Sequence, residues 1–337
     1  MSIIPESLFT PQTNDWKISL SKAIRSQTDL LAYCELDVSC TKNQGEVDFP
    51  VRVTRYYASL IEKGNARDPL LLQVLADYRE QQTVAGYSLD AVGDMAAMKA
   101  PGLIHKYQSR VLLTVTGACP IHCRYCFRRH FPYAESSPDL QLHSEALTYL
   151  TSQHQINEVI LSGGDPLMLS DQKLSSLICQ LNQLDHIRYL RVHSRLLSVL
   201  PERITQQVLD IFSQFKGRVI FVTHINHPNE LSSINGKSLQ LLSEQGFQLF
   251  NQTVILNGIN DSADILAELS YILFDYRITP YYLHKLDKVH GAAHFDLSDE
   301  RLCTIYRQLC TLLPGYLTPK FVNELSGRTS KTPVQCF

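Results

Sequence analysis

The alternation of short apolar segments with amphipathic ones, from Arg110 onward, most restricts the folds open to this chain. The apolar, β-branched segments predict strands at 111–115, 158–162, 189–193, 218–224, 248–256 and 278–283. The amphipathic segments between them predict helices at 143–154, 171–184, 201–215, 236–245 and 262–274. Such alternation predicts a parallel sheet with right-handed crossovers. Because six units are fewer than the eight of a closed barrel, we expect an α/β fold with a partial (β/α)6 TIM-like barrel rather than a doubly wound sheet.

Two further segments flank the predicted barrel. Helical periodicity at positions such as Trp16, Leu20 and Ile24 predicts an N-terminal helical region over residues 1–99. The barrel is expected over residues 100–290, and a short C-terminal segment over residues 291–337.

Composition argues against several classes of function. The 337 residues carry a net charge of −2, and the short basic patch at 128–130 fits an anionic small molecule better than a nucleic acid. No apolar stretch reaches the roughly 18 residues of a membrane span, and the first residues lack the features of a targeting sequence. The nine cysteines are odd in number and irregularly spaced, so we expect no disulfide framework and a cytoplasmic protein.

Three cysteines, Cys119, Cys123 and Cys126, lie within eight residues directly after the first predicted strand. Three thiolates can bind three irons of a [4Fe–4S] cluster, whose usual fourth thiolate would be missing, so one iron would stay open for chemistry. Structural zinc is the alternative, but it prefers four ligands in two closely spaced pairs, and the sequence holds no second pair. The spacing therefore predicts an iron–sulfur cluster on this loop.

Polar residues follow the predicted strands at their carboxyl ends, where barrel enzymes carry their chemistry. They include Ser162, Gly163, Gly164 and Asp165 after the second strand, His224 and Asn226 after the fourth, and Gln252 in the fifth. The two glycines allow a backbone to approach a ligand closely. His224 and His227 could also bind a metal ion, but the loop offers no third ligand nearby, so a metal site is the less favoured interpretation.

These motifs together resemble a known family. The C-x3-C-x2-C loop, with an aromatic residue before its last cysteine, resembles the radical S-adenosylmethionine (SAM) enzymes, which have a partial barrel. The segments 123–129, 162–165, 224–230, 251–261 and 280–282 are similar to C-R-x-C-x-R-R, S-G-G-D, H-x-N-H-P-N-E, N-Q-x-V-x-L-x-G-x-N-D and P-Y-Y of the lysine 2,3-aminomutase family. The resemblance covers about residues 100–333. Segments 62–65, 127–135, 281–295 and 330–333 resemble its shorter branch, which serves elongation factor P.

The resemblance implies three cofactors: a [4Fe–4S] cluster, SAM bound to its open iron, and pyridoxal 5′-phosphate (PLP). The residues implied in cofactor binding are Ser162, Gly163, Gly164, Asp165, His224, Asn226 and Gln252. Lys331 aligns with the family's catalytic lysine, which holds PLP covalently, although only Gly327 remains of the glycine-rich run before it. Lys106 and Arg110 would lie near the PLP phosphate; a salt bridge at the barrel rim is the alternative for both.

The resemblance also implies how an amino acid would be recognised. Arg128 would bind its α-carboxylate, and Asp287 and Glu324 would bind a distant ammonium, with Glu324 standing where the family has an aspartate. Longer members carry a zinc-binding cysteine cluster near the C-terminus and a further cysteine where this chain has Ser262. We therefore expect neither zinc nor the zinc-bridged tetramer here.

The implied activity is that of an L-lysine 2,3-aminomutase, an isomerase that forms (R)-β-lysine for attachment to elongation factor P by a separate ligase. A flavodoxin- or ferredoxin-type reductant would supply the electron that starts the reaction. Two alternatives remain open. One is an aminomutase for another amino acid such as glutamate, and the other is a catalytically idle iron–sulfur binding or sensor protein, which would need neither Lys331 nor Arg128.

Overall fold

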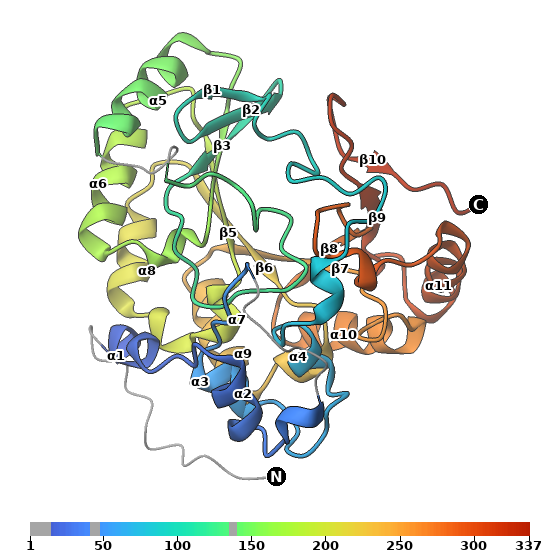
Figure 1. The fold of residues 1–337 in the computed structure, drawn as a ribbon. Helices are drawn as coiled ribbons and strands as arrows, with labels where there is room; N and C mark the ends of the chain where they lie inside the picture. Colours follow the sequence, from blue (N-terminus) through green and yellow to red (C-terminus); the bar gives the residue numbers. More distant parts are fainter. Residues whose placement is uncertain (1–14, 41–47, 135–139) are drawn as a thin grey trace.

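The fold is built on one ten-stranded sheet whose strands follow one another in chain order (Figure 1). The structure, a computed structural model, describes residues 15–40, 48–134 and 140–337. The strands are β1 (Met98–Ala100), β2 (Leu103–Tyr107), β3 (Arg110–Thr114), β4 (Glu158–Ser162), β5 (Tyr189–Ser194), β6 (Arg218–His224), β7 (Gln248–Val254), β8 (Thr279–His284), β9 (Lys320–Asn323) and β10 (Thr332–Pro333). Pairing is parallel from β3 to β9 and antiparallel at both edges.

The sheet curves into an open barrel, which confirms the predicted fold class. The predicted strands 158–162 and 218–224 coincide with β4 and β6, and the others differ by one or two residues at an end. The prediction was incomplete in one respect, because β9 adds a seventh parallel strand beside β8. Its four residues are too few to give a clear alternating pattern.

The described residues contain eleven α-helices, and the longer ones among them cover the outer face of the sheet. They are α1 (Asp15–Ser21), α2 (Gln27–Tyr33), α3 (Arg55–Ser59), α4 (Pro69–Leu72), α5 (Leu140–Ser152), α6 (Asp171–Leu181), α7 (Leu196–Val199), α8 (Gln206–Ser213), α9 (Ser233–Glu244), α10 (Ala263–Asp275) and α11 (Asp299–Leu312). Figure 1 shows α5, α6 and α8 side by side along one flank, and α10 with α11 at the other. Leu190 and Val192 of β5 join the main core with α6 and α8, whereas Arg191 and His193 alternate to the opposite face.

One predicted helix is shorter than expected for a local reason. The prediction ran from residue 201 to 215, but α8 begins only at Gln206. The hydroxyl of Thr205 accepts a hydrogen bond from the backbone N–H of Val208, so Thr205 caps the helix. Residues before it form a separate 3-10 turn that starts at Pro201.

The N-terminal region contains fewer helical residues than the predicted helical region over 1–99. The described helices there, α1 to α4, are four to seven residues long and are joined by turns and loops. Residues 1–14 and 41–47 of the prediction lie outside the described residues. The region has a core of its own, in which Leu30, Tyr57 and Leu71 pack against Ile121 and Val199 of the barrel. Its backbone also contacts the cysteine loop, since Arg52 accepts a hydrogen bond from the N–H of His122.

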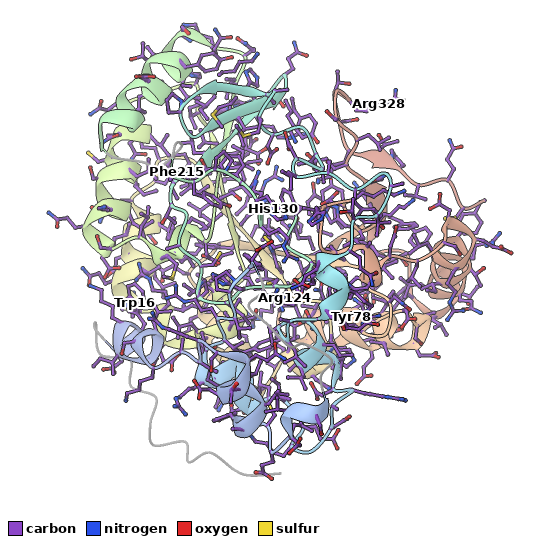
Figure 2. All side chains as sticks on the ribbon, in the orientation of Figure 1. Trp16, Tyr78, Arg124, His130, Phe215 and Arg328 are labelled. Atoms are coloured by element: carbon purple, nitrogen blue, oxygen red, sulfur yellow. A yellow bond between two sulfur atoms is a disulfide. The ribbon has the colours of Figure 1, made fainter. Side chains whose placement is uncertain are left out.

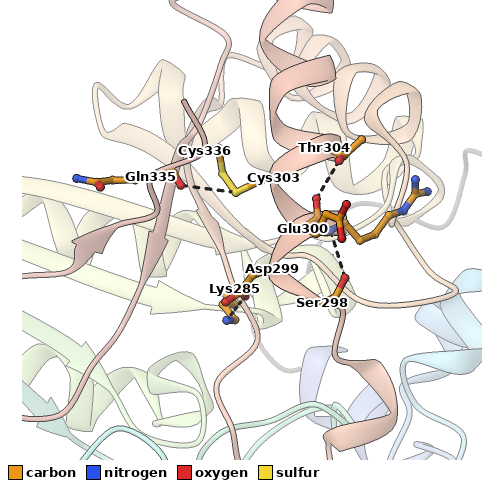
Figure 3. The surroundings of a disulfide bond; sticks show 9 residues. Lys285, Ser298, Asp299, Glu300, Cys303, Thr304, Gln335 and Cys336 are labelled. Atoms are coloured by element: carbon orange, nitrogen blue, oxygen red, sulfur yellow. Dashed lines mark hydrogen bonds and ion pairs between the residues drawn. A yellow bond between two sulfur atoms is a disulfide. The ribbon is translucent and has the colours of Figure 1, made fainter.

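The C-terminal segment is larger than its description as a short extension suggests. Helix α11 packs on α10, β9 extends the barrel, and β10 runs back along β9. Cys303 of α11 and Cys336 after β10 form a disulfide (Figure 3). The expectation of no disulfide framework did not foresee this single bond between cysteines 33 residues apart. No described helix is long and apolar enough to span a membrane.

Candidate active site

The cysteine loop follows β3 and lies at the carboxyl end of the parallel strands. Cys119, Cys123 and Cys126 are partly exposed residues, yet loss of hydration around the sulfur raises the pKa of each thiol, that of Cys126 to about 11. Bringing three thiolates together without a cation is unfavourable, so the site suits a cationic iron centre that compensates their charge.

A single metal ion fits this loop poorly. In the described ranges of the chain, no three His, Cys, Asp or Glu side chains converge as they would around one ion. Thiolates that each bind a different iron of a cluster do not have to converge in this way. The three thiols therefore fit a [4Fe–4S] cluster better than a single ion, and the assignment of Cys119, Cys123 and Cys126 as its ligands stays a prediction. His224 and His227, the weaker alternative metal site, are not part of any such group either.

Two buried arginines fix the loop to the N-terminal region. Arg124, which is fully buried, donates from Nε to Oε1 of Glu80 at 2.8 Å and from Nη2 to Oε2. Arg129 also reaches Oε2 of Glu80, at 2.6 Å. Burial alone would raise the pKa of Glu80, but the two arginines lower it, so the carboxylate is charged. Figure 2 places Arg124 near the centre of the molecule.

The glycine pair after β4 packs against the backbone of the cysteine loop. Gly163 has a φ of +122°, and a Cβ there would lie 2.4 Å from the carbonyl oxygen of Thr116. A Cβ on Gly164 would lie 2.3 Å from the carbonyl oxygen of Ala118. Gly164 also donates its N–H to Thr116 at 2.7 Å. These glycines are therefore needed to seat the cluster loop, and their contact with SAM stays a prediction.

Asp165 has a role in holding the strands together. Its carboxylate accepts hydrogen bonds from the backbone N–H groups of Leu167, Arg195 and Leu196 and from the Ser194 hydroxyl. Burial raises the pKa of Asp165 to about 6, against the effect of these donors. The side chain thus ties the turn after β4 to the end of β5. Both of its carboxylate oxygens already accept hydrogen bonds from the protein.

A second buried network lies under the cysteine loop. Tyr125 lies between Cys123 and Cys126 in the sequence. Its hydroxyl contacts Arg195 Nη1 and Asn226 Nδ2, the latter at 2.7 Å. Arg195 Nη2 donates to Gln73 Oε1 and Glu230 Oε2, both at 3.0 Å. The Asn226 amide, predicted to bind a cofactor, also reaches Gln73 at 3.1 Å. In this structure Asn226 hydrogen-bonds within the network that supports the loop, and its contact with a cofactor stays a prediction.

His224 and Gln252, both predicted to bind a cofactor, contact each other from neighbouring strands, and their cofactor role stays a prediction. Their side-chain nitrogens, Nε2 of each, lie 2.9 Å apart. Burial lowers the pKa of His224 to about 3, so the ring is neutral. His193 of β5 packs edge-on to it, with ring centroids 5.7 Å apart, and its Nε2 is buried without a partner.

Lys331 and Glu324 face each other at the opposite side of the barrel opening. Lys331 Nζ lies 2.5 Å from Glu324 Oε2 and 5.6 Å from the ring centroid of Tyr282. Lys106 Nζ lies 3.2 Å from Glu324 Oε1 and 2.6 Å from Asp94 Oδ1. Burial would raise the pKa of Glu324, but Lys331 and Lys106 bring it down to about 2. Lys331 is thus a part-buried amine among charged side chains, and its role in holding PLP stays a prediction.

Arg128 continues the same line of charges. Its Nε donates to Asp94 Oδ2 at 2.7 Å, and its Nη1 donates to the Ser162 hydroxyl at 2.9 Å. Ser162, predicted to bind a cofactor, therefore orients the arginine in this structure. Lys331, Glu324, Lys106, Asp94 and Arg128 together alternate in sign, and we call these five residues the charge line.

Asp287 lies beside the charge line with an open acceptor. Its Oδ1 is buried and makes no hydrogen bond. Burial raises the pKa of Asp287 to about 7, while the nearby Lys331 ammonium opposes the shift. His284 at the end of β8 also leaves a buried Nε2 without a partner. Buried polar atoms without a partner are uncommon, and among those of the described residues the Asp287 oxygen belongs to a predicted substrate-binding residue.

Arg110, predicted with Lys106 to lie near the PLP phosphate, is not part of the charge line. Its guanidinium stacks over Tyr107 at 4.5 Å from the ring centroid, and the residue keeps some exposure. Lys106 does form the rim salt bridges considered as its alternative role. A place for either residue at the PLP phosphate stays a prediction.

The prediction missed the partners of the site residues. These are Gln73, Glu80, Asp94, Arg195 and Glu230. Asp77 and Glu80 form a capping box, a local pattern that the sequence displays, but the pattern does not indicate the two arginines that Glu80 binds. No local signal marks Asp94.

Comparison with known proteins identifies the family. Residues 113–269 match the model described as the Radical SAM superfamily. The chain is 42% identical over 331 residues to the L-lysine 2,3-aminomutase of Escherichia coli (strain K12), covering 97% of this chain and 96% of that protein. It is 40% identical to the L-lysine 2,3-aminomutase of Haemophilus influenzae (98% and 99% covered) and 33% identical to that of Clostridium subterminale (95% and 78% covered). The chain therefore belongs to the L-lysine 2,3-aminomutase family of the radical SAM superfamily.

Proposed function

We propose that this chain is an isomerase that converts L-lysine into (R)-β-lysine. The observation that carries the proposal is the charge line, which brings Arg128, for a carboxylate, and Lys331, for PLP, to the same opening as Asp287 and Glu324. The names of its relatives support the same reaction. A sensor protein would need neither Arg128 nor Lys331.

Arg128 is suited to bind the substrate carboxylate. Asp94 and Ser162 occupy Nε and Nη1, which holds the guanidinium plane in one orientation. Nη2 makes no hydrogen bond to the described residues, so it is available to the α-carboxylate. A charge-assisted hydrogen bond of this kind is stronger than a neutral one and fixes which end of the amino acid enters first.

Asp287 and Glu324 are suited to bind the side-chain ammonium of lysine. Glu324 already accepts a lysine ammonium, that of Lys331, and Asp287 has an unpartnered oxygen. Leaving a buried carboxylate without a cation costs about 1–3 kcal/mol, so an amino acid without a terminal ammonium should be disfavoured by about ten- to a hundredfold. An acidic pocket of this kind also argues against glutamate as the substrate.

The cofactors would occupy the two sides of the opening. Cys119, Cys123 and Cys126 would hold the cluster that binds SAM, and Lys331 would hold PLP. When bound, the cluster and SAM supply the radical that starts the rearrangement, and PLP carries the migrating amino group. The chain's own contribution is to orient lysine with Arg128, Asp287 and Glu324 and to keep the His193, His224 and His284 rings neutral around it.

The proposal extends to the biological role. The segments that resemble the shorter branch of the family support the use of the product on elongation factor P, by a separate ligase, in the cytoplasm. A flavodoxin- or ferredoxin-type protein would reduce the cluster. A strain lacking the gene for this chain should accumulate elongation factor P without its β-lysyl group, as measured by intact-protein mass spectrometry.

The central test is turnover by purified, anaerobically reconstituted protein supplied with SAM, PLP, a chemical reductant and L-lysine. We expect (R)-β-lysine, identified by chiral chromatography, and no product from glutamate or alanine. Glutamate turnover at a comparable rate would contradict the substrate assignment. Absence of any product, from protein with full iron and PLP content, would favour the sensor alternative.

The role of Lys331 can be tested separately from activity. Lys331→Ala should lose the visible absorbance of bound PLP and keep that of the iron–sulfur cluster, because the two groups are held by different residues. Lys285→Ala is the matched control, since Lys285 pairs with Asp299 outside the charge line. Borohydride trapping followed by peptide mapping should place PLP on Lys331, and a label on Lys285 or Lys288 would contradict the assignment.

A further inference from the structure

Asp94 joins Arg128 to Lys106, and so to the rest of the charge line, although it comes from outside the barrel. It lies between α4 and β1, and only 2% of its surface is exposed. Its Oδ2 accepts from Arg128 Nε at 2.7 Å, and its Oδ1 forms an ion pair with Lys106 Nζ at 2.6 Å. Each carboxylate oxygen therefore serves a different cation.

The backbone around Asp94 is fixed by its own turn. Asp90 Oδ1 accepts a hydrogen bond from the N–H of Asp94 at 2.9 Å, and Oδ2 accepts one from Met95 at 3.0 Å. Gly93 has a φ of +71°, a conformation that favours glycine, and a Cβ there would lie 2.2 Å from the Ser326 hydroxyl oxygen. The turn is thus seated on the C-terminal segment that carries Lys331.

The way in which Asp94 binds Arg128 decides which guanidinium atoms remain for a ligand. A carboxylate that only neutralised Arg128 could pair with its two terminal nitrogens, the usual bidentate arrangement. Asp94 binds Nε instead, and Ser162 accepts from Nη1. This leaves the Nη2 end of the guanidinium directed away from the protein contacts described here.

We propose that Asp94 is a positioning residue, which aims Arg128 at the substrate carboxylate and holds it at a fixed spacing from Lys106 and the Lys331 side of the site. The inference rests on the proposed function, since it assigns the carboxylate of lysine to Arg128. Asp94 does not touch the substrate. It acts through Arg128, so its effect depends on whether a ligand carries a carboxylate.

The test compares two ligands of the PLP-loaded protein without SAM, by equilibrium dialysis. L-Lysine carries the α-carboxylate, whereas L-lysinamide has a neutral amide in its place and keeps both amines. Asp94→Asn should weaken L-lysine binding at least tenfold and change L-lysinamide binding less than twofold. In turnover, KM for lysine should rise more than kcat falls. Iron content and PLP absorbance should match the wild type.

Asp171→Asn is the matched control, because Asp171 also pairs with a buried arginine, Arg203, but away from the charge line. It should leave the affinity for both ligands unchanged. Asp94→Glu covers the case in which Asp94→Asn folds poorly, since it keeps the charge and moves the oxygens by one methylene. If Asp94 only neutralises charge, Asp94→Glu binds lysine as tightly as the wild type, and the proposal is overturned.

The failures of the two proposals are distinguishable. Wild-type protein that binds neither lysine nor lysinamide would contradict the proposed function. Wild-type protein that binds lysine, together with an Asp94→Asn variant that loses affinity for both ligands equally, would overturn the positioning role alone. A double variant, Asp94→Asn with Arg128→Gln, should bind lysine no more weakly than Arg128→Gln, because Asp94 acts through that arginine.

Discussion

The two sides of the barrel opening use buried charges differently. On the cysteine-loop side, each of three buried arginines, Arg124, Arg129 and Arg195, has a carboxylate partner in Glu80 or Glu230. Nε of Arg129 and Nε of Arg195 are also buried without a hydrogen-bond partner, but the charge of each guanidinium is compensated by its carboxylate. On the Lys331 side, the buried atoms without a partner are an oxygen of the Asp287 carboxyl group and a ring nitrogen of His284. Paired charges hold a loop in place without any ligand, whereas unpaired polar atoms are a cost that a ligand can remove. The ion pairs of the first side therefore support the cysteine loop, and the unpartnered atoms of the second side are consistent with the substrate site proposed there.

The largest expected effect is the loss of stability on replacing Glu80, whose carboxylate is shared by Arg124 and Arg129. Glu80→Gln leaves Arg124 and Arg129 without a counter-charge, and breaking a buried ion pair costs about 3–5 kcal/mol. We expect a loss of that size in the free energy of unfolding by urea, together with lower iron incorporation. Glu158→Gln is the control, because its partner Arg191 is less buried than Arg124. Equal losses in the two variants would contradict a special role of the buried Glu80 pairs in stabilising the cysteine loop.

The disulfide offers a way to sharpen the comparison on the Lys331 side. The closed loop spans 33 residues and includes Lys331, so the chain-entropy model assigns it about 3–4 kcal/mol of stability. Cys336→Ser should lower the unfolding free energy by up to that amount under oxidising conditions. Cys310→Ser should have little effect, since Cys310 is a free cysteine on the same helix. If the reduced wild-type protein has the same free energy of unfolding as the oxidised protein, the disulfide contributes nothing to stability.

The smallest expected effect is a pH dependence of KM for lysine, which arises from the carboxyl group of Asp287. Burial raises the pKa of Asp287 to about 7, so its carboxyl is neutral below that pH and anionic above it. The lysine side chain, with a pKa of about 10.4, stays charged throughout, so KM for lysine should fall about tenfold between pH 6 and pH 8. Glu324, with a pKa of about 2, does not titrate in this range. Asp287→Asn should remove the slope, and a slope that persists would assign it to another group.

Much of the barrel was predictable because its strands are apolar and bounded by polar turns. The segments 158–162 and 218–224 agree with β4 and β6 at both ends. β9 was missed because four residues give no usable periodicity, and the helix over 201–215 was too long because the prediction did not weigh Thr205 as a cap. Local sequence patterns therefore predict long apolar strands well. They fail for very short strands and for helices whose start is set by a capping residue.

The site was only half predictable for a different reason. Cys119 and Lys331 could be predicted because each lies in a motif formed by residues next to it in the sequence. Their partners lie far away along the chain: Arg124 and Glu80 are 44 residues apart, and Arg195 and Gln73 are 122 apart. Such pairs depend on how the N-terminal region docks on the barrel, and no spacing rule in a single sequence encodes that arrangement.

The ion pair between Lys106 and Glu324 has a consequence for how the barrel is closed. Lys106 belongs to β2 and Glu324 follows β9, strands near opposite edges of the open sheet. Backbone hydrogen bonds close an eight-stranded barrel permanently, but these two edges meet here through side chains. Side chains can exchange one ionic partner for another without unravelling a strand. The closure between these two edges therefore depends on the charge of two side chains and not on a ladder of backbone hydrogen bonds.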